Sequence, residues 1–119
     1  MKLTVLLILL FISTYLTANE ADVLAVDIQP LSSGEYRISV TLEHADTGWE
    51  HYANAWEVID EQGQVIGERV LYHPHVNEQP FTRSLTLKLP AGLKTLTIRA
   101  KDSVHAYGGK TITVAVPAP

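Results

Sequence analysis

Apolar and polar residues alternate along most of the chain after residue 20, with the period of two that predicts half-buried β-strands. Such alternation places one face of a strand on a core and the other in water. The clearest case is the segment 35–43, whose apolar positions are Tyr36, Ile38, Val40 and Leu42. Together with the turn residues between them, the alternating segments predict strands at residues 22–29, 35–43, 54–60, 64–72, 83–89, 94–102 and 110–116.

Turn-forming residues separate these strands, and no helical period follows residue 18. The stretches 30–34, 60–63 and 90–93 carry the prolines and glycines expected of tight connections. Seven short strands at regular spacing predict an all-β fold, a single seven-stranded antiparallel β-sandwich. The order resembles that of an immunoglobulin-like or fibronectin III-like sandwich, in which the third strand often buries a tryptophan, here Trp56.

The first 18 residues follow a different pattern. A basic start at Met1 and Lys2 precedes an apolar run at 3–12 and a polar stretch at 13–18, the order of a secretory signal peptide. The run is shorter than the roughly 20 residues that span a bilayer. We therefore expect a signal peptide helix at 1–18, a β-sandwich domain at 19–119, and a periplasmic or secreted bacterial protein with no membrane anchor after cleavage.

The net charge and the absence of cysteine exclude some kinds of partner and of covalent stabilisation. The formal net charge is −4 and no basic stripe is present, so nucleic acid is not an expected partner. The chain has no cysteine, which excludes both a disulfide staple and a signal peptide of the lipoprotein type. A domain of this size can bury a sufficient core without staples, and we expect a monomer.

All five histidines fall in the predicted loops, and only in the second, fourth and sixth of them. Successive strands of an antiparallel sandwich run up and down, so alternate loops lie at the same end. If the strand count is right, one end of the molecule carries every histidine. Two of these loops are about ten residues long, a length that usually serves function. The histidines concerned are His44, His51, His73, His75 and His105.

The strongest local motif is His73-Pro74-His75, because two histidines two apart on an extended segment can reach one ion. Neutral imidazole suits Zn(II) and Cu(II), so one of these is the expected metal if one is bound. His51, His105 and His44 are the candidates for further ligands, and the acidic residues that could complete or orient the site are Asp46, Glu50, Glu78 and Asp102. The only methionine is Met1, which excludes a methionine-rich Cu(I) site.

Two readings without metal stay open. In the first, the histidines are hydrogen-bonded loop residues that hold three long loops together. In the second, the same loops form a binding or protein-interaction module in which aromatic and charged side chains contact a partner. The residues assigned to that surface are Trp49, Tyr52, Glu78, Arg83 and Tyr107. Arg83 could equally belong to a local network that satisfies its own loop.

The segment Asp102-Ser103-Val104-His105 contains the residue types of an acyl-transfer enzyme. The chain has no Gly-x-Ser-x-Gly turn and no marked oxyanion-hole segment. A pair of carboxylates suited to glycoside hydrolysis is equally unmarked. We therefore expect no catalytic residues and no enzyme activity.

Three segments carry a resemblance to a known group. Residues 44–52, 73–83 and 102–105 are similar to the corresponding segments of a group of small exported bacterial proteins with an immunoglobulin-like or fibronectin-type β-sandwich. The likeness covers most of the chain after the signal peptide. It implies export and a β architecture, and it assigns no catalytic residue.

Overall fold

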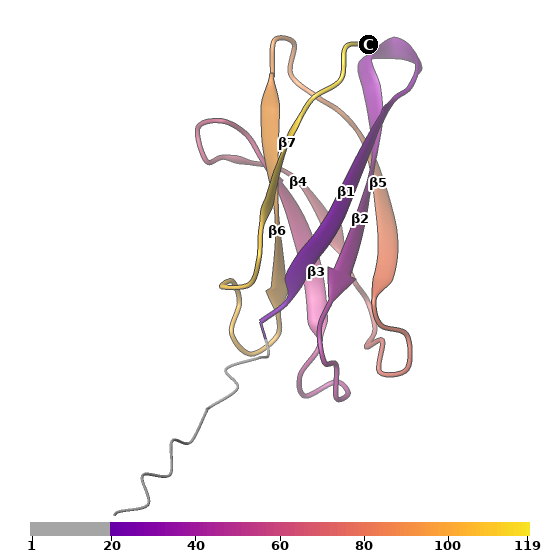
Figure 1. The fold of residues 1–119 in the computed structure, drawn as a ribbon, viewed down its shortest axis with the longest axis vertical. Helices are drawn as coiled ribbons and strands as arrows, with labels where there is room; N and C mark the ends of the chain where they lie inside the picture. The colour runs from indigo at the N-terminus through magenta and orange to yellow at the C-terminus, as the bar shows by residue number, and fades with distance from the viewer. Residues whose placement is uncertain (1–19) are drawn as a thin grey trace, which may run out of the picture.

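A computed structural model describes residues 20–119, and the predicted signal peptide helix at 1–18 lies outside them. The elements, shown in Figure 1, are β1 (Asp22–Pro30), the 3-10 turn η1 (Ser32–Gly34), β2 (Glu35–Glu43), β3 (Ala53–Ile59), β4 (Val65–Val70), β5 (Phe81–Lys88), β6 (Thr95–Asp102) and β7 (Ile112–Ala115). In this part of the chain no helix is long and apolar enough to cross a membrane.

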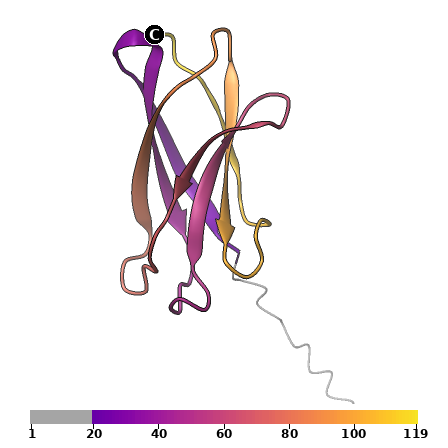
Figure 2. The same ribbon diagram turned by 180° about the vertical axis from the view of Figure 1, so that it is seen from behind.

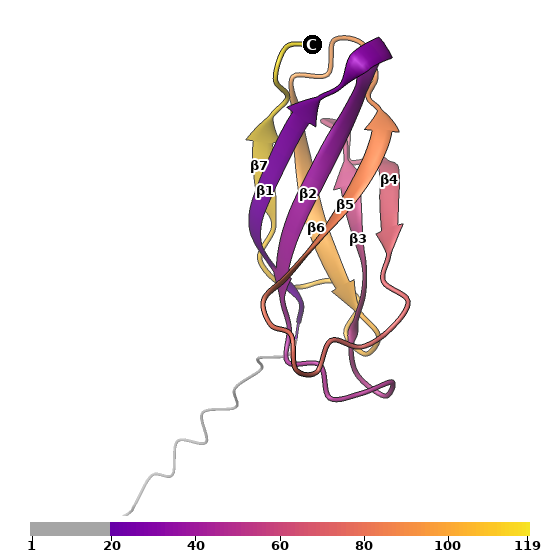
Figure 3. The ribbon, with the colours of Figure 1, turned by 90° about the vertical axis from the view of Figure 1, so that its right-hand side faces the viewer.

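The seven strands form two antiparallel sheets. One has the order β1-β2-β5 and the other the order β4-β3-β6-β7. Figure 3 looks onto β1, β2 and β5 with the four-stranded sheet behind them, and Figure 2 shows the molecule from behind. The prediction of an all-β fold with seven antiparallel strands is confirmed.

The core lies between the two sheets, and alternation along the strands fills it. In β2 the apolar positions of the predicted period are the buried ones, and in β6 Leu96, Ile98 and Ala100 alternate with half-exposed residues in the same way. Trp56 on β3 is fully buried, as its place in the third strand predicts. Burying each large apolar side chain contributes roughly 1.5–3 kcal/mol, so these rows fix which way every strand faces.

Strand ends differ from the predicted ones by about two residues where the neighbouring backbone leaves the ladder. The predicted strand 64–72 stops at Val70, and the next N–H, that of Leu71, bonds the carbonyl of Asn54. The predicted strand 110–116 begins at Ile112, because the N–H of Lys110 bonds Asp22 Oδ1 instead of a sheet partner. The alternation of apolar and polar residues does not reveal such contacts, so it could not predict these strand ends.

The three loops at one end of the sandwich hold all five histidines (Figure 1). We call this end the histidine pole, and it consists of residues 44–52, 71–80 and 103–111. The connections at the opposite end, around η1 and between β5 and β6, hold none. The strand count made from the sequence therefore put the histidines on the correct loops.

Candidate functional site: a histidine and aspartate cluster

Asp102, the last residue of β6, is the centre of the histidine pole. It follows Leu96, Ile98 and Ala100 on the inward face of the strand, and 2% of its surface is exposed. Its Oδ2 accepts hydrogen bonds from His51 Nε2 at 2.7 Å and from His105 Nδ1 at 3.0 Å. The same oxygen also accepts the backbone N–H groups of the turn that follows, those of Val104 and His105.

The two oxygens of this carboxylate differ. Oδ1 of Asp102 is buried and has no hydrogen-bond partner among residues 20–119. Burial opposes ionisation, but the hydrogen bonds from the N–H of His105, the side chain of His51 and the N–H of Val104 outweigh it, so the pKa of Asp102 lies below its ordinary value. The cluster therefore contains a buried carboxylate anion with one uncommitted oxygen.

Asp46 is the second buried carboxylate of the pole, and it ties two of the loops together. Its Oδ1 accepts hydrogen bonds from His44 Nδ1 at 2.5 Å and from the N–H of Ala53, where β3 begins. Its Oδ2 accepts the N–H of His75, in the loop between β4 and β5. Hydrogen bonds to a charged acceptor contribute about 1.5–3 kcal/mol each, so this side chain fixes the relative position of the two loops.

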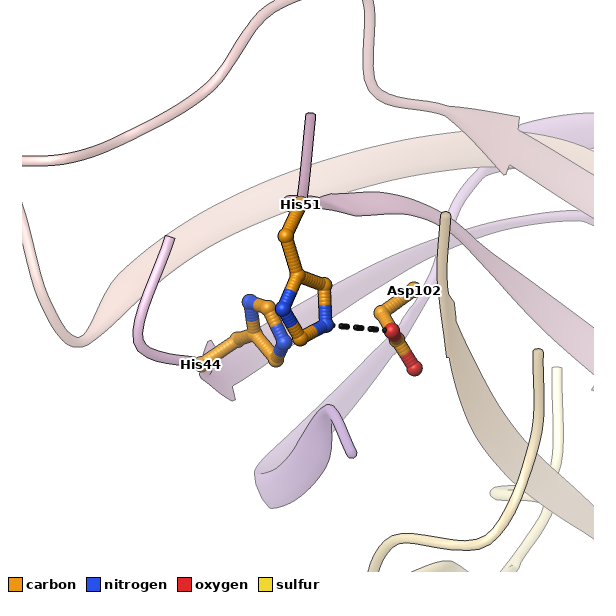
Figure 4. Close-up of side chains that lie close together, drawn as sticks. All are labelled: His44, His51 and Asp102. Atoms are coloured by element: carbon orange, nitrogen blue, oxygen red, sulfur yellow. Dashed lines mark hydrogen bonds and ion pairs between the residues drawn. The ribbon is translucent and has the colours of Figure 1, made fainter. Parts of the chain in front are cut away.

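His44, His51 and Asp102 come from three separate segments and meet at one place (Figure 4). One potential ligand atom from each lies within 4.8 Å of the other two. The rings of His44 and His51 are edge to face, with centroids 4.7 Å apart. Two imidazoles and a carboxylate within this distance form a donor set that suits Zn(II) or Cu(II).

His44 is oriented for such a role by its neighbour. A neutral His44 ring that donates from Nδ1 to Asp46 has its lone pair on the other ring nitrogen, Nε2. A carboxylate behind a histidine is the usual outer partner of a metal ligand, since it fixes both the tautomer and the ring orientation. His44 and Asp46 have fully buried side chains, so this orientation is held rigidly.

His105 lies beside the cluster but outside the set of three. Its ring centroid is 5.0 Å from that of His51, and both histidines donate to the same oxygen of Asp102. The side chain of His105 is 40% exposed, against 15% for His51. The pole thus grades from a buried inner group to an exposed outer histidine.

His73 and His75 form a separate pair at the pole. Their ring centroids are 4.6 Å apart, and His75 is buried and stacked on Phe81. Nε2 of His75 accepts a hydrogen bond from the guanidinium of Arg83 at 3.0 Å, because arginine can only donate. Burial, the charge of Arg83 and the neighbouring His73 all lower the pKa of His75 below its ordinary value.

The structure therefore distributes the predicted metal ligands over two places. His44 and His51 meet at Asp102 with His105 next to them, while His73 and His75 lie outside that group. An arginine that already occupies the lone pair of His75 opposes a cation at that nitrogen. The sequence named Asp102 only as a residue that could complete the shell, although its inward register on β6 already marked it as buried.

Of the residues predicted to contact a partner, Trp49, Tyr52, Glu78 and Tyr107 lie on the same pole, and Arg83 lies beside it on β5. Trp49 is 66% exposed and meets the ring of Tyr52 edge to face. Arg83 pairs with Glu78 at 3.5 Å and donates to the carbonyl of Thr82, so it belongs to the local network of its loop. The large apolar residues exposed on the three loops are Trp49, Tyr72, Val76, Val104 and Tyr107.

Tyr107 is the least exposed of these side chains, and charged residues hold it. The guanidinium of Arg99 lies 3.9 Å from the centre of its ring. Arg99 also pairs with the buried carboxylate of Glu57 at 2.9 Å. A hydrogen bond to Glu57 raises the pKa of Tyr107, and burial adds to that rise. Tyr107 is therefore anchored to the four-stranded sheet.

The chain is similar to a protein of Halomicrobium mukohataei that is named "Putative lipoprotein". The two are 38% identical over 99 residues, which cover 83% of this chain and 49% of that protein. The chain thus spans about half the length of this relative. No family model matches the chain, and no solved structure matches it.

Proposed function

We propose that the histidine pole binds one divalent transition-metal ion, Zn(II) or Cu(II), through His44, His51 and Asp102. The observation that carries the proposal is the meeting of three ligand atoms within 4.8 Å around a buried carboxylate with one unpaired oxygen. Buried polar atoms are nearly always hydrogen-bonded, so the unpaired oxygen of a carboxylate that already binds His51 supports an ion at this place. Ligand bonds of about 2.0–2.2 Å would need only a modest contraction of the group.

The donor set also limits the ion. It contains nitrogen and oxygen but no sulfur, and the chain has no cysteine and only Met1 as methionine. Soft ions such as Cu(I) prefer sulfur, whereas imidazole and carboxylate suit Zn(II) and Cu(II). In this proposal the protein binds or carries the ion and has no enzyme activity.

The test is a metal titration of the protein without a histidine tag. Bound metal is measured by mass spectrometry after dialysis, and Zn(II) and Cu(II) are then titrated by calorimetry. We expect one ion per chain with a Kd tighter than about 10 µM. His51→Ala should weaken binding by more than the roughly 10–100-fold that loss of an outer partner costs.

His73→Ala is the matched control, because His73 is an exposed histidine of the same pole outside the group. It should bind the ion as the wild type does. If His73→Ala abolishes binding and His51→Ala does not, the ion sits on the His73 and His75 pair and the proposed ligand set is wrong. Absence of binding to the wild type would overturn the metal proposal as a whole.

A second candidate is a metal-free interaction module on the same loops. The observation that favours it is the exposure of large apolar side chains on all three loops of the pole, led by Trp49. Apolar groups gathered at one surface indicate a contact site. Trp49→Ala should then lose a partner while the circular dichroism spectrum and the unfolding midpoint stay those of the wild type.

We further infer that the two sheets form a sandwich of the immunoglobulin-like or fibronectin III-like type, and that the protein is exported. The orders β1-β2-β5 and β4-β3-β6-β7 support the first inference. The pattern of the first 18 residues and the name of the Halomicrobium relative support the second. The 119 residues contain no cysteine to which a lipid could be attached, so we carry over export and not lipidation.

A further inference from the structure

The pole holds two overlapping groups of ligands that share one carboxylate. The inner group is His44, His51 and Asp102, whose ligand atoms all lie within 4.8 Å of one another. His105 does not belong to that group, yet its Nδ1 lies 3.0 Å from Oδ2 of Asp102. An ion bound to the inner group and an ion bound to His105 would therefore occupy different positions around the same side chain.

Exposure increases in order across these groups. The side chains of His44 and Asp102 are fully buried, that of His51 is 15% exposed, and that of His105 is 40% exposed. A hydrated ion from solution can reach His105 without any movement of the fold. His51 contacts both other rings, with its centroid 4.7 Å from that of His44 and 5.0 Å from that of His105, so it connects the exposed histidine with the buried one.

The two oxygens of Asp102 suit such a passage. Oδ2 faces the histidines at 51 and 105, which both donate to it, and Oδ1 is buried without a partner. An ion held by Oδ2 can stay in contact with this carboxylate while the histidine that binds it changes. The backbone N–H groups of Val104 and His105 keep the side chain in place meanwhile.

We propose that His105 is the exchange ligand of this site: it receives the ion together with Asp102 and passes it inward to His44 and His51. His44 binds through Nε2, which already carries a lone pair, whereas the protons that His51 and His105 direct at Asp102 move to the other nitrogen of each ring when the ion binds, and release reverses these steps. The site then loads and unloads its ion, as a carrier does, and does not hold it permanently. This inference rests on the proposed metal site.

The experiment compares rates with affinities. Uptake of Zn(II) by the whole protein and its release to an excess of a coloured chelator are followed by stopped flow, and the Kd is measured separately. For His105→Ala we expect uptake and release to slow together by about tenfold or more, with a Kd within about threefold of the wild type. His73→Ala, which removes an exposed histidine elsewhere on the pole, should leave both rates unchanged.

Three results would overturn the proposal in different ways. A Kd weakened tenfold with an unchanged uptake rate would make His105 a resident ligand of the site. Unchanged rates and affinity would exclude it from the path. Failure of the wild type to bind Zn(II) would instead remove the proposed function itself. His105→Ala should fold, because the turn is held by backbone N–H groups, and a circular dichroism spectrum checks this.

Discussion

At the scale of the residue, the pole depends on ionisable side chains taken out of water in fixed states. Asp46 and Asp102 are buried carboxylates, and each accepts hydrogen bonds from more than one segment of the chain. His75, in contrast, is buried as a neutral ring. Its Nε2 accepts a hydrogen bond from Arg83 and therefore cannot carry a proton at the same time. A substitution that removes one hydrogen-bonding partner leaves the buried polar atom of the other residue unpaired. The resulting loss of stability is larger than the net contribution of the hydrogen bond itself.

The lowered pKa of His75 predicts how stability changes with pH. The unfolded chain binds a proton to this ring near pH 6.5, whereas the folded protein resists it to lower pH. Between the two values the unfolded state binds more protons, so the free energy of unfolding falls as the pH falls below about 6.5. His75→Phe removes this titrating group and keeps a ring stacked on Phe81. As the pH falls, the free energy of unfolding of this variant should therefore decrease less than that of the wild type.

The measurement is urea unfolding of both proteins at about pH 7.5 and about pH 5.5. The change in the free energy of unfolding between the two pH values is compared between the variant and the wild type, so that the contributions of the other histidines cancel. The groups that act on His75 are Arg83 from β5, His73 and Glu78 from its own loop, and Asp46 from the loop between β2 and β3. Val76→Ala, an exposed change one residue away, should behave as the wild type does. An equal loss of stability in His75→Phe and the wild type would contradict the prediction.

At the scale of the element, the β6–β7 loop is locked against the start of β1. The N–H of Val23 donates to the carbonyl of Lys110, and the N–H of Lys110 donates to Asp22 Oδ1. Gly109 lets the two segments approach, because a Cβ there would overlap the carbonyl oxygen of Ala21. This contact holds the loop that carries His105 next to the rest of the pole.

Gly109→Ala should therefore destabilise the protein strongly. The atom it would strike belongs to the backbone and cannot rotate away, so the loop and β1 must separate. We expect a loss of about 2–4 kcal/mol in urea unfolding. Gly92→Asn is the control: a Cβ there meets nothing within 4 Å, and asparagine tolerates its φ of +84°. It should cost about 1 kcal/mol or less, and equal losses in the two variants would contradict the argument.

At the scale of the whole molecule, the sandwich brings distant parts of the chain together at its end. Residues 51 and 102 lie 51 positions apart in sequence, yet their side chains are joined at 2.7 Å. The three loops meet only when both sheets are formed, so an ion bound there binds the folded state and not the unfolded chain. Metal binding and global stability should therefore be coupled.

Zn(II) at about a hundredfold excess over its Kd should stabilise the wild type by about 2.7 kcal/mol. The increase should appear in thermal unfolding followed by circular dichroism, disappear on addition of a chelator, and persist in His73→Ala. His51→Ala should show little or no increase at the same concentration, because the inner group has lost a ligand. Stabilisation of His51→Ala by the full amount would show that the ion binds elsewhere.

Much of this molecule could be predicted from local patterns. The period of two and the turn residues located all seven strands to within about two residues, and the place of Trp56 in the third strand and of Trp49 in a loop predicted which of them is buried. The alternation of strand direction then placed the histidines at one end. These features are local because the period of a strand and the residues of a turn are set by neighbours in sequence.

The cluster of His44, His51 and Asp102 could not be predicted in the same way. The nearest pair in sequence, His73 and His75, had the strongest motif, but Arg83 from β5 binds His75 and the pair lies outside the group. The group that forms instead joins three segments through Asp102, whose inward turn at the end of β6 decides which rings it meets. The sequence by itself determined the strands, their faces and the loops that carry the histidines. Only the tertiary structure decided which histidines meet, because side-chain convergence depends on how the two sheets bring chain segments together, and no spacing along the chain records it.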